Sequence, residues 1–214
     1  MLLVGLCTAC NARAQSQPPA DLQAFVTEYV AAYNAKDAGR LLALYNSASR
    51  ACVTGTGKEF YDRALAVMWR DPIPSRYKFT LAAVNEDNLK AIETFGRFPV
   101  KPARELHIDY QQGDDAGSVI VYLVPDNGYW RADQPCATDE TLKKFRDEAP
   151  ARQAREARNQ SLADAIQEPL RSQLIELLRA HKTGEAIDRY KDASGQDTQT
   201  AMFVINQLAQ QVKR

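Results

Sequence analysis

The sequence has no net charge, almost no histidine and no long apolar run, and each shortage argues against a class of function. Lysine plus arginine number 27, and aspartate plus glutamate also number 27. The chain therefore has no bulk electrostatic field toward nucleic acid or anionic lipid, and we expect no nucleic-acid partner. No apolar run approaches the roughly 20 residues that a membrane-spanning helix requires, so we expect no transmembrane segment.

Metal-binding patterns are also missing. The two histidines are His107 and His181. Cys7 and Cys10 are spaced as CxxC but lie in the apolar first residues, and beyond residue 14 Cys52 and Cys136 form neither a CxxC pair nor a Cys/His spacing typical of zinc sites. The sequence therefore predicts no metal site, and no motif in it indicates a cofactor.

The composition that remains is that of a globular protein. Hydrophobic residues make up 45% of the chain and charged residues 25%. A length of 214 residues suits one medium-sized domain or two small ones, each able to bury a core.

The first residues resemble an export signal. Residues 1–10 (MLLVGLCTAC) are short and apolar, and small residues at Ala12 and Ala14 match an export-peptidase site before Gln15. This pattern predicts a signal peptide at residues 1–14 and a periplasmic or secreted protein. Because no basic residue precedes the apolar stretch, a misassigned start codon or a loose N-terminus remains an alternative. A second alternative is a lipoprotein anchored through Cys10.

Cleavage at that site removes two of the four cysteines. It leaves Cys52 and Cys136 in an oxidising compartment, where they are candidates for one disulfide. The alternative interpretation is two separate buried thiols.

The first half of the mature chain contains helices and then strands. Apolar residues recur at helical spacing in three segments, 21–33, 41–45 and 58–70. Alternating or continuous apolar runs separated by turn residues then predict strands. The expected strands are 77–84, 89–95, 105–111, 118–124 and 129–132. Helices that precede an antiparallel sheet without alternating with it predict an α+β fold.

The strand expected at 105–111 has one apolar and one polar face. Glu105, His107 and Asp109 alternate along the polar face, where they could form an acid/base or metal-binding patch, or else a solvated surface. The run 118–124 is apolar at nearly every position, so we expect it to be central and covered on both faces.

Residues 24–45 (AFVTEYVAAYNAKDAGRLLALY) resemble the opening of NTF2-like domains of the SnoaL/ketosteroid-isomerase type. In these domains a helix ends in an Asn-Ala-x-Asp turn before a Leu-rich second helix. The resemblance covers residues 21–138 and implies a curved antiparallel sheet wrapped around the first helix as a cone. It also implies an apolar ligand pocket, which we place at Phe25, Tyr29, Tyr33 and Trp69.

The resemblance supports catalysis only in part. Tyr29 falls where the steroid isomerases place a tyrosine that donates a hydrogen bond to a developing oxyanion. The general-base carboxylate of those enzymes falls on Val53, and the strand 118–124 has no carboxylate for the second donor. Tyr29 is therefore also interpreted as a core aromatic residue. Glu105, His107 and Asp109 remain weak candidates for an atypical base.

The second half is helical. Residues 139–160 are rich in charges of both signs and predict a helical connector, and residues 161–214 predict a small helical region. Residues 174–211 resemble the helix-turn-helix part of the C-terminal domain of ribosomal protein L7/L12. The matching residues are Ala186, Ile187, Tyr190, Lys191, Ser194, Gly195, Ala201, Val204 and Leu208. The resemblance implies a helix hairpin and a docking surface for a protein partner.

Two functions follow from these observations. The first is an exported noncatalytic NTF2-like protein that binds a small apolar ligand or a protein partner. The alternative is an NTF2-like isomerase, dehydratase or hydrolase that uses Tyr29 as a hydrogen-bond donor with Asp109 or Glu105 as base. A carboxylate beside the Tyr29 hydroxyl would favour the enzyme. The sequence leaves open whether the chain forms a homodimer through its sheet.

Overall fold

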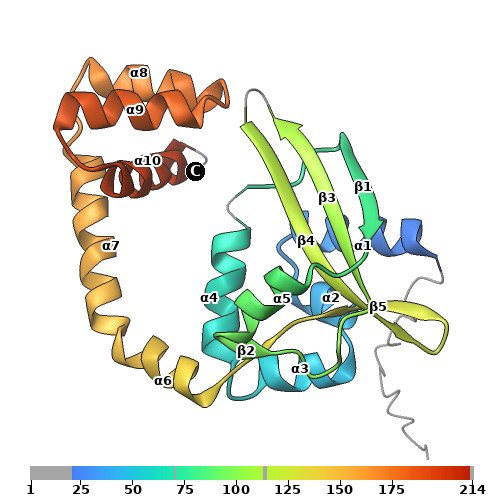
Figure 1. Ribbon diagram of the computed structural model, residues 1–214. Coiled ribbons are helices and arrows are strands. Elements are labelled where there is room, and N and C mark those ends of the chain that lie inside the picture. The colour runs from blue at the N-terminus through green and yellow to red at the C-terminus, as the bar shows by residue number, and fades with distance from the viewer. Residues whose placement is uncertain (1–20, 70, 113–114, 213–214) are drawn as a thin grey trace, which may run out of the picture.

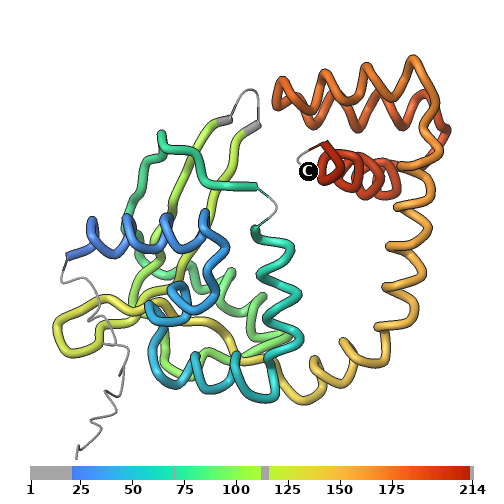
Figure 2. Tube along the Cα trace, turned by 180° about the vertical axis from the view of Figure 1, so that it is seen from behind, coloured from blue at the N-terminus to red at the C-terminus, as the bar shows by residue number. Residues whose placement is uncertain are grey.

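A computed structural model describes residues 21–69, 71–112 and 115–212. The predicted signal peptide, with Cys10, lies outside the described residues. The chain has the expected α+β fold: an antiparallel sheet with helices before and after it. Figures 1 and 2 show an N-terminal half built on the sheet, a cluster of three helices at the other end of the chain, and a helical arm between them.

Short polar side chains begin three of the first four helices. The Asp21 carboxylate caps α1 (Leu22–Asn34), and the Asp37 carboxylate caps α2 (Ala38–Ala43), each by accepting a backbone N–H of the first turn. The Asn46 side chain caps α3 (Ser47–Thr54) in the same way. The fourth helix is α4 (Lys58–Met68). Helix α3 is an addition to the three expected helices, because its sequence SASRACVT has too few apolar residues to show a helical period.

The main sheet has four antiparallel strands in the order β1-β3-β4-β5. They are β1 (Tyr77–Ala82), β3 (Arg104–Gln112), β4 (Asp115–Asp126) and β5 (Tyr129–Asp133). Leu106 and Ile108 of β3 are fully buried in one cluster with α1, so this face of the sheet forms the first hydrophobic core with the N-terminal helices. Strand β4 is central as expected, but only residues 121–124 are buried in succession, and Ile120 is 43% exposed.

The prediction of a strand at 89–95 is wrong. This segment belongs to α5 (Glu86–Glu93), which the Asn85 side chain caps by accepting the N–H groups of Asp87 and Asn88. Asn85 and two acidic residues in the first turn favour a helix start over the weak strand pattern that follows. After the helix, β2 (Gly96–Arg97) pairs with β6 (Cys136–Ala137) in a separate two-stranded sheet.

The C-terminal half is helical, as predicted. Helices α6 (Asp139–Asp147) and α7 (Ala149–Asp164) form the arm, which corresponds to the expected connector. They lead to a cluster of α8 (Leu170–Arg179), α9 (Thr183–Ser194) and α10 (Thr198–Val212). Gly195 ends α9 with a φ of +66°, a backbone conformation that suits glycine. A second hydrophobic core lies between these helices and the end of α7, and it includes Leu174, Tyr190 and Leu208.

Contacts between α4 and the arm join the two halves. The rings of Phe60 and Phe145 meet edge to face with centroids 5.4 Å apart, and Arg63 forms an ion pair with Glu156. The Arg152 guanidinium lies 4.1 Å from the centre of the Phe145 ring. The Phe60–Phe145 and Arg63–Glu156 contacts join α4 to the arm, whereas the Arg152–Phe145 contact lies within the arm and joins α7 to α6.

Candidate functional site

Three of the four residues predicted to line a ligand pocket form a row of aromatic rings. Phe25, Tyr29 and Tyr33 follow one face of α1, with successive ring centroids 6.2 and 6.3 Å apart. All three are buried in the first core. Burial, together with the neighbouring Tyr45 and Tyr33, raises the pKa of Tyr29 well above its ordinary value, so its hydroxyl stays protonated. The row therefore lies in the core that α1 shares with the sheet.

The other hydroxyl of this row has a structural partner. Tyr33 donates its hydroxyl proton to the backbone carbonyl of Met68, which ties α1 to the end of α4. Burial, with nearby Tyr110 and Asp71, raises the pKa of Tyr33 to about 12. Trp69, the fourth predicted residue, packs against the same core, and its indole Nε1 is buried with no hydrogen-bond partner among the described residues.

The three weak candidates for an atypical base lie on the other face of the sheet. Successive residues of a strand point to opposite faces, and Leu106 and Ile108 point toward α1. Glu105, His107 and Asp109 therefore point away from Tyr29. The sheet therefore lies between these three side chains and Tyr29.

Glu105 and Asp109 have partners on their own face. Glu105 is only 1% exposed, accepts the Asn85 N–H at 2.9 Å and lies 3.0 Å from Nε2 of His107. Asp109 accepts the Ser118 hydroxyl at 2.7 Å. The Glu105 contact joins β3 to the start of α5, which accounts for a buried carboxylate without assigning it a reaction.

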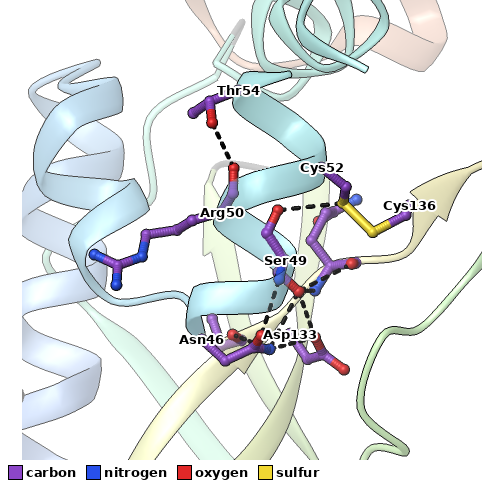
Figure 3. Close-up of a disulfide and its surroundings, with 9 residues drawn as sticks. Asn46, Ser49, Arg50, Cys52, Thr54, Asp133 and Cys136 are labelled. Carbon is purple, nitrogen blue, oxygen red and sulfur yellow. Dashed lines mark hydrogen bonds between the residues drawn. A yellow bond between two sulfur atoms is a disulfide. The ribbon is translucent and has the colours of Figure 1, made fainter. Parts of the chain in front are cut away.

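The predicted disulfide is present. Cys52 of α3 bonds to Cys136 of β6, with Cα atoms 5.7 Å apart (Figure 3). Beside it, Asp133 accepts hydrogen bonds from the Asn46 side chain and the Ser49 hydroxyl. Burial raises the pKa of Asp133, and these hydrogen bonds offset part of that effect. The disulfide and these hydrogen bonds connect α3 to the end of β5 and to β6.

A cavity of about 550 Å³ lies at the junction of the two halves. Its sheet side is formed by the cross-strand pair Tyr110 and Gly117, with Ala116, at the end of β3 and β4. Its helical side is formed by the turn between α8 and α9 and by the last turns of α10. The helical residues are Leu178, Arg179, His181, Thr183, Asn206, Ala209 and Val212. In Figures 1 and 2 the β3–β4 hairpin and the α8–α9 turn lie close together.

Gly117 allows Tyr110 to form this wall. A Cβ atom at position 117 would lie 2.4 Å from the Tyr110 ring, which is closer than any side chain tolerates. The ring therefore rests directly on the backbone of β4. Tyr110 points to the same face as Leu106 and Ile108, so the cavity continues from the end of the row of rings on α1.

The cavity contains both apolar and polar groups. Leu178, Ala209 and Val212 face it from the helices. The polar side chains that line it are Asp71, which follows α4, and Arg179, His181, Thr183 and Asn206 of the helical side. A volume of about 550 Å³ lies within the range of roughly 300–1,000 Å³ typical of small-molecule sites. The described residues contain no group of three or more histidine, cysteine or acidic side chains that could hold a metal ion.

The cavity residues were not found from the sequence. The glycine-containing segment 113–117 reads as a turn, but Gly117 lies inside β4, opposite Tyr110. The helical side of the cavity depends on how the C-terminal cluster sits against the sheet, which no local pattern encodes. None of the four residues expected in a ligand pocket lines this cavity.

Comparison with known proteins does not add a family. No protein-family model, no curated protein and no solved structure matches the chain. Across the described ranges, none of the helices has the length and apolar character needed to cross a bilayer.

Proposed function

We propose that this chain is an exported, noncatalytic protein with an NTF2-like N-terminal domain, and that it binds a small, largely apolar ligand. The observation that carries the proposal is the cavity of about 550 Å³ between the sheet and the C-terminal helices. Its size and its combination of apolar walls with polar groups are properties of small-molecule sites.

The position of the cavity supports binding as its role. The sheet and the helical cluster each have a separate core, and the cavity lies between these two cores. A ligand between them would bury apolar surface from both halves. The row of aromatic rings lies in the core between α1 and the sheet, and Tyr110 of the cavity wall lies near Tyr33 at one end of that row.

The noncatalytic part of the proposal rests on the two faces of the sheet. Tyr29 lies on the α1 face, and the carboxylates of Glu105 and Asp109 lie on the other. The NTF2-like part rests on the resemblance of residues 24–45 and on the order of helices before an antiparallel sheet that packs on α1. Export is supported by the Cys52–Cys136 disulfide, which is typical of oxidising compartments.

The test is a titration with N-phenyl-1-naphthylamine, an uncharged apolar dye whose fluorescence rises in an apolar site. We expect saturable binding of one dye per chain. Ala209→Trp places a large ring in the cavity wall and should abolish that binding. Met202→Trp, on the same helix but 45% exposed and outside the cavity, is the matched control and should bind normally.

Two results would contradict the proposal. One is the absence of saturable dye binding by the folded protein. The other is equal binding by the wild type and by a folded Ala209→Trp variant, because the dye would then occupy another place. Native mass spectrometry of the purified chain would report any copurified small molecule and the number of subunits in the same experiment.

A further inference from the structure

Two side chains of opposite charge line the cavity, Arg179 on its helical side and Asp71 after α4. Arg179 lines the cavity at the end of α8, and its guanidinium makes no hydrogen bond or ion pair within the described part of the chain. Most other basic residues of the cluster do have such partners: Arg171 contacts Gln211, Arg189 contacts Gln173, and Lys191 contacts Asp188. An arginine at a helix C-terminus is favourable in itself, but it does not need to face a cavity.

The carboxylate of the cavity lies in a different setting. Asp71 follows α4, and its charge contributes to the raised pKa values of Tyr33 and Tyr110, so it lies near those two phenol groups. Asp71 also takes part in interactions with the rest of the protein. Arg179 therefore differs from Asp71 in having its charge available to a ligand.

From this arrangement we infer that the ligand is an anionic amphiphile, whose acid group pairs with Arg179 while its apolar part lies against Tyr110, Leu178 and Val212. The inference rests on the proposed binding function and adds the charge and orientation of the ligand. A guanidinium suits this role because its planar donors match the oxygens of a carboxylate, sulfonate or phosphate. Asn206 and Thr183 add further polar groups to the same cavity.

The ligand's apolar part is matched by the opposite wall. The Tyr110 ring lies close to the Gly117 backbone and presents an aromatic surface to the cavity. A ring or chain placed on it would also contact the aliphatic side chains of α8 and α10. An amphiphile with one acid group and one apolar body fits both walls at once.

The test uses two dyes with the same anilinonaphthalene skeleton. N-phenyl-1-naphthylamine is neutral, and 1-anilinonaphthalene-8-sulfonate carries one negative charge. Arg179→Gln should weaken binding of the sulfonate about tenfold and leave binding of the neutral dye within about twofold. Arg179→Lys keeps the charge and should restore most of the sulfonate affinity. Arg155→Gln, an exposed arginine outside the cavity, is the control and should change neither.

Salt provides an independent measurement. Raising the ionic strength should weaken binding of the sulfonate dye to the wild type more than to Arg179→Gln, because salt screens the ion pair between the dye and Arg179. The inference is overturned if the neutral dye binds the wild type and Arg179→Gln leaves the affinity for the sulfonate dye unchanged. It is also overturned if this substitution weakens the binding of both dyes equally. If the neutral dye does not bind the wild type, the proposed function itself fails. Circular dichroism of each variant confirms that it is folded.

Discussion

The two halves of this chain have separate cores, and each core is stabilised by a different kind of contact. The N-terminal half depends on contacts between distant residues: a four-stranded sheet, a disulfide that joins residues 84 positions apart, and the group of Asn46, Ser49 and Asp133. The C-terminal cluster depends on packing between helices that follow one another along the chain. This difference predicts two separable stabilities, with the cavity at the junction as the place where a ligand couples them.

The two tryptophans make this comparison measurable. Trp69 and Trp130 both pack against the first core, so tryptophan fluorescence reports the N-terminal half alone. Far-UV circular dichroism reports helices from both halves. Unfolding followed by both signals therefore distinguishes damage to one half from damage to the other.

Loss of the disulfide should have the largest effect. In the chain-entropy model, a bridge that closes a loop of this length contributes about 4.5 kcal/mol. The double variant Cys52→Ala/Cys136→Ala should shift the fluorescence transition to much lower denaturant and leave the helical signal of the C-terminal cluster in place. An equal shift of both signals would show that the two halves unfold together, contrary to our comparison.

A cavity made in the second core should give the opposite pattern. Leu208 is fully buried in α10, so Leu208→Ala should cost about 2–5 kcal/mol in the C-terminal cluster. The circular dichroism signal should show an additional transition at lower denaturant, from the C-terminal cluster, while the midpoint of the fluorescence transition stays unchanged. Met202→Ala, exposed on the same helix, is the control and should change neither signal. A shifted fluorescence midpoint in Leu208→Ala would contradict the independence of the two cores.

Removal of a hydroxyl beside the disulfide should have an intermediate effect. Ser49 is fully buried and donates to Asp133, so Ser49→Ala leaves a buried carboxylate with one partner fewer and should cost about 1–3 kcal/mol. The fluorescence transition should report this loss. Ser47→Ala, at an exposed position of the same helix, should be nearly neutral. Equal effects of the two substitutions would argue against a structural role for the polar group.

The contact between the arm and α4 should contribute least. The Arg63 and Glu156 side chains are 41% and 39% exposed, so Glu156→Gln should change stability by at most about 1 kcal/mol. The effect should shrink further at high salt. A larger, salt-independent loss in both optical signals would mean that this pair couples the two halves more strongly than its exposure suggests.

The sequence predicted the fold class and the helical second half well, because these depend on strong local signals. The spacing of Phe25, Tyr29 and Tyr33 predicted the helix α1. The alternation of apolar and polar residues along 105–111 predicted the two faces of β3. Helix α5 was missed because the capping side chain of Asn85 was interpreted as part of a turn. Asparagine is common both in turns and at helix N-termini, and only the hydrogen bonds that its side chain accepts distinguish the two.

The candidate site could not be predicted in the same way. The resemblance to NTF2-like domains placed the ligand beside Tyr29, where the structure has a row of buried aromatic rings. The cavity brings together Tyr110, Arg179 and Ala209, which are far apart in sequence and belong to halves with separate cores. Only the placement of the two halves relative to each other joins them, and no local pattern of residues specifies that placement.

Hydrogen–deuterium exchange of the intact chain, with and without saturating N-phenyl-1-naphthylamine, tests the central claim most directly. If the ligand site is the cavity at the junction, the dye should slow exchange in two segments at once: the ends of β3 and β4 around Tyr110, and the α8–α9 turn with the last turns of α10. Slower exchange in only one of these halves, or only around Tyr29 on α1, would contradict the account.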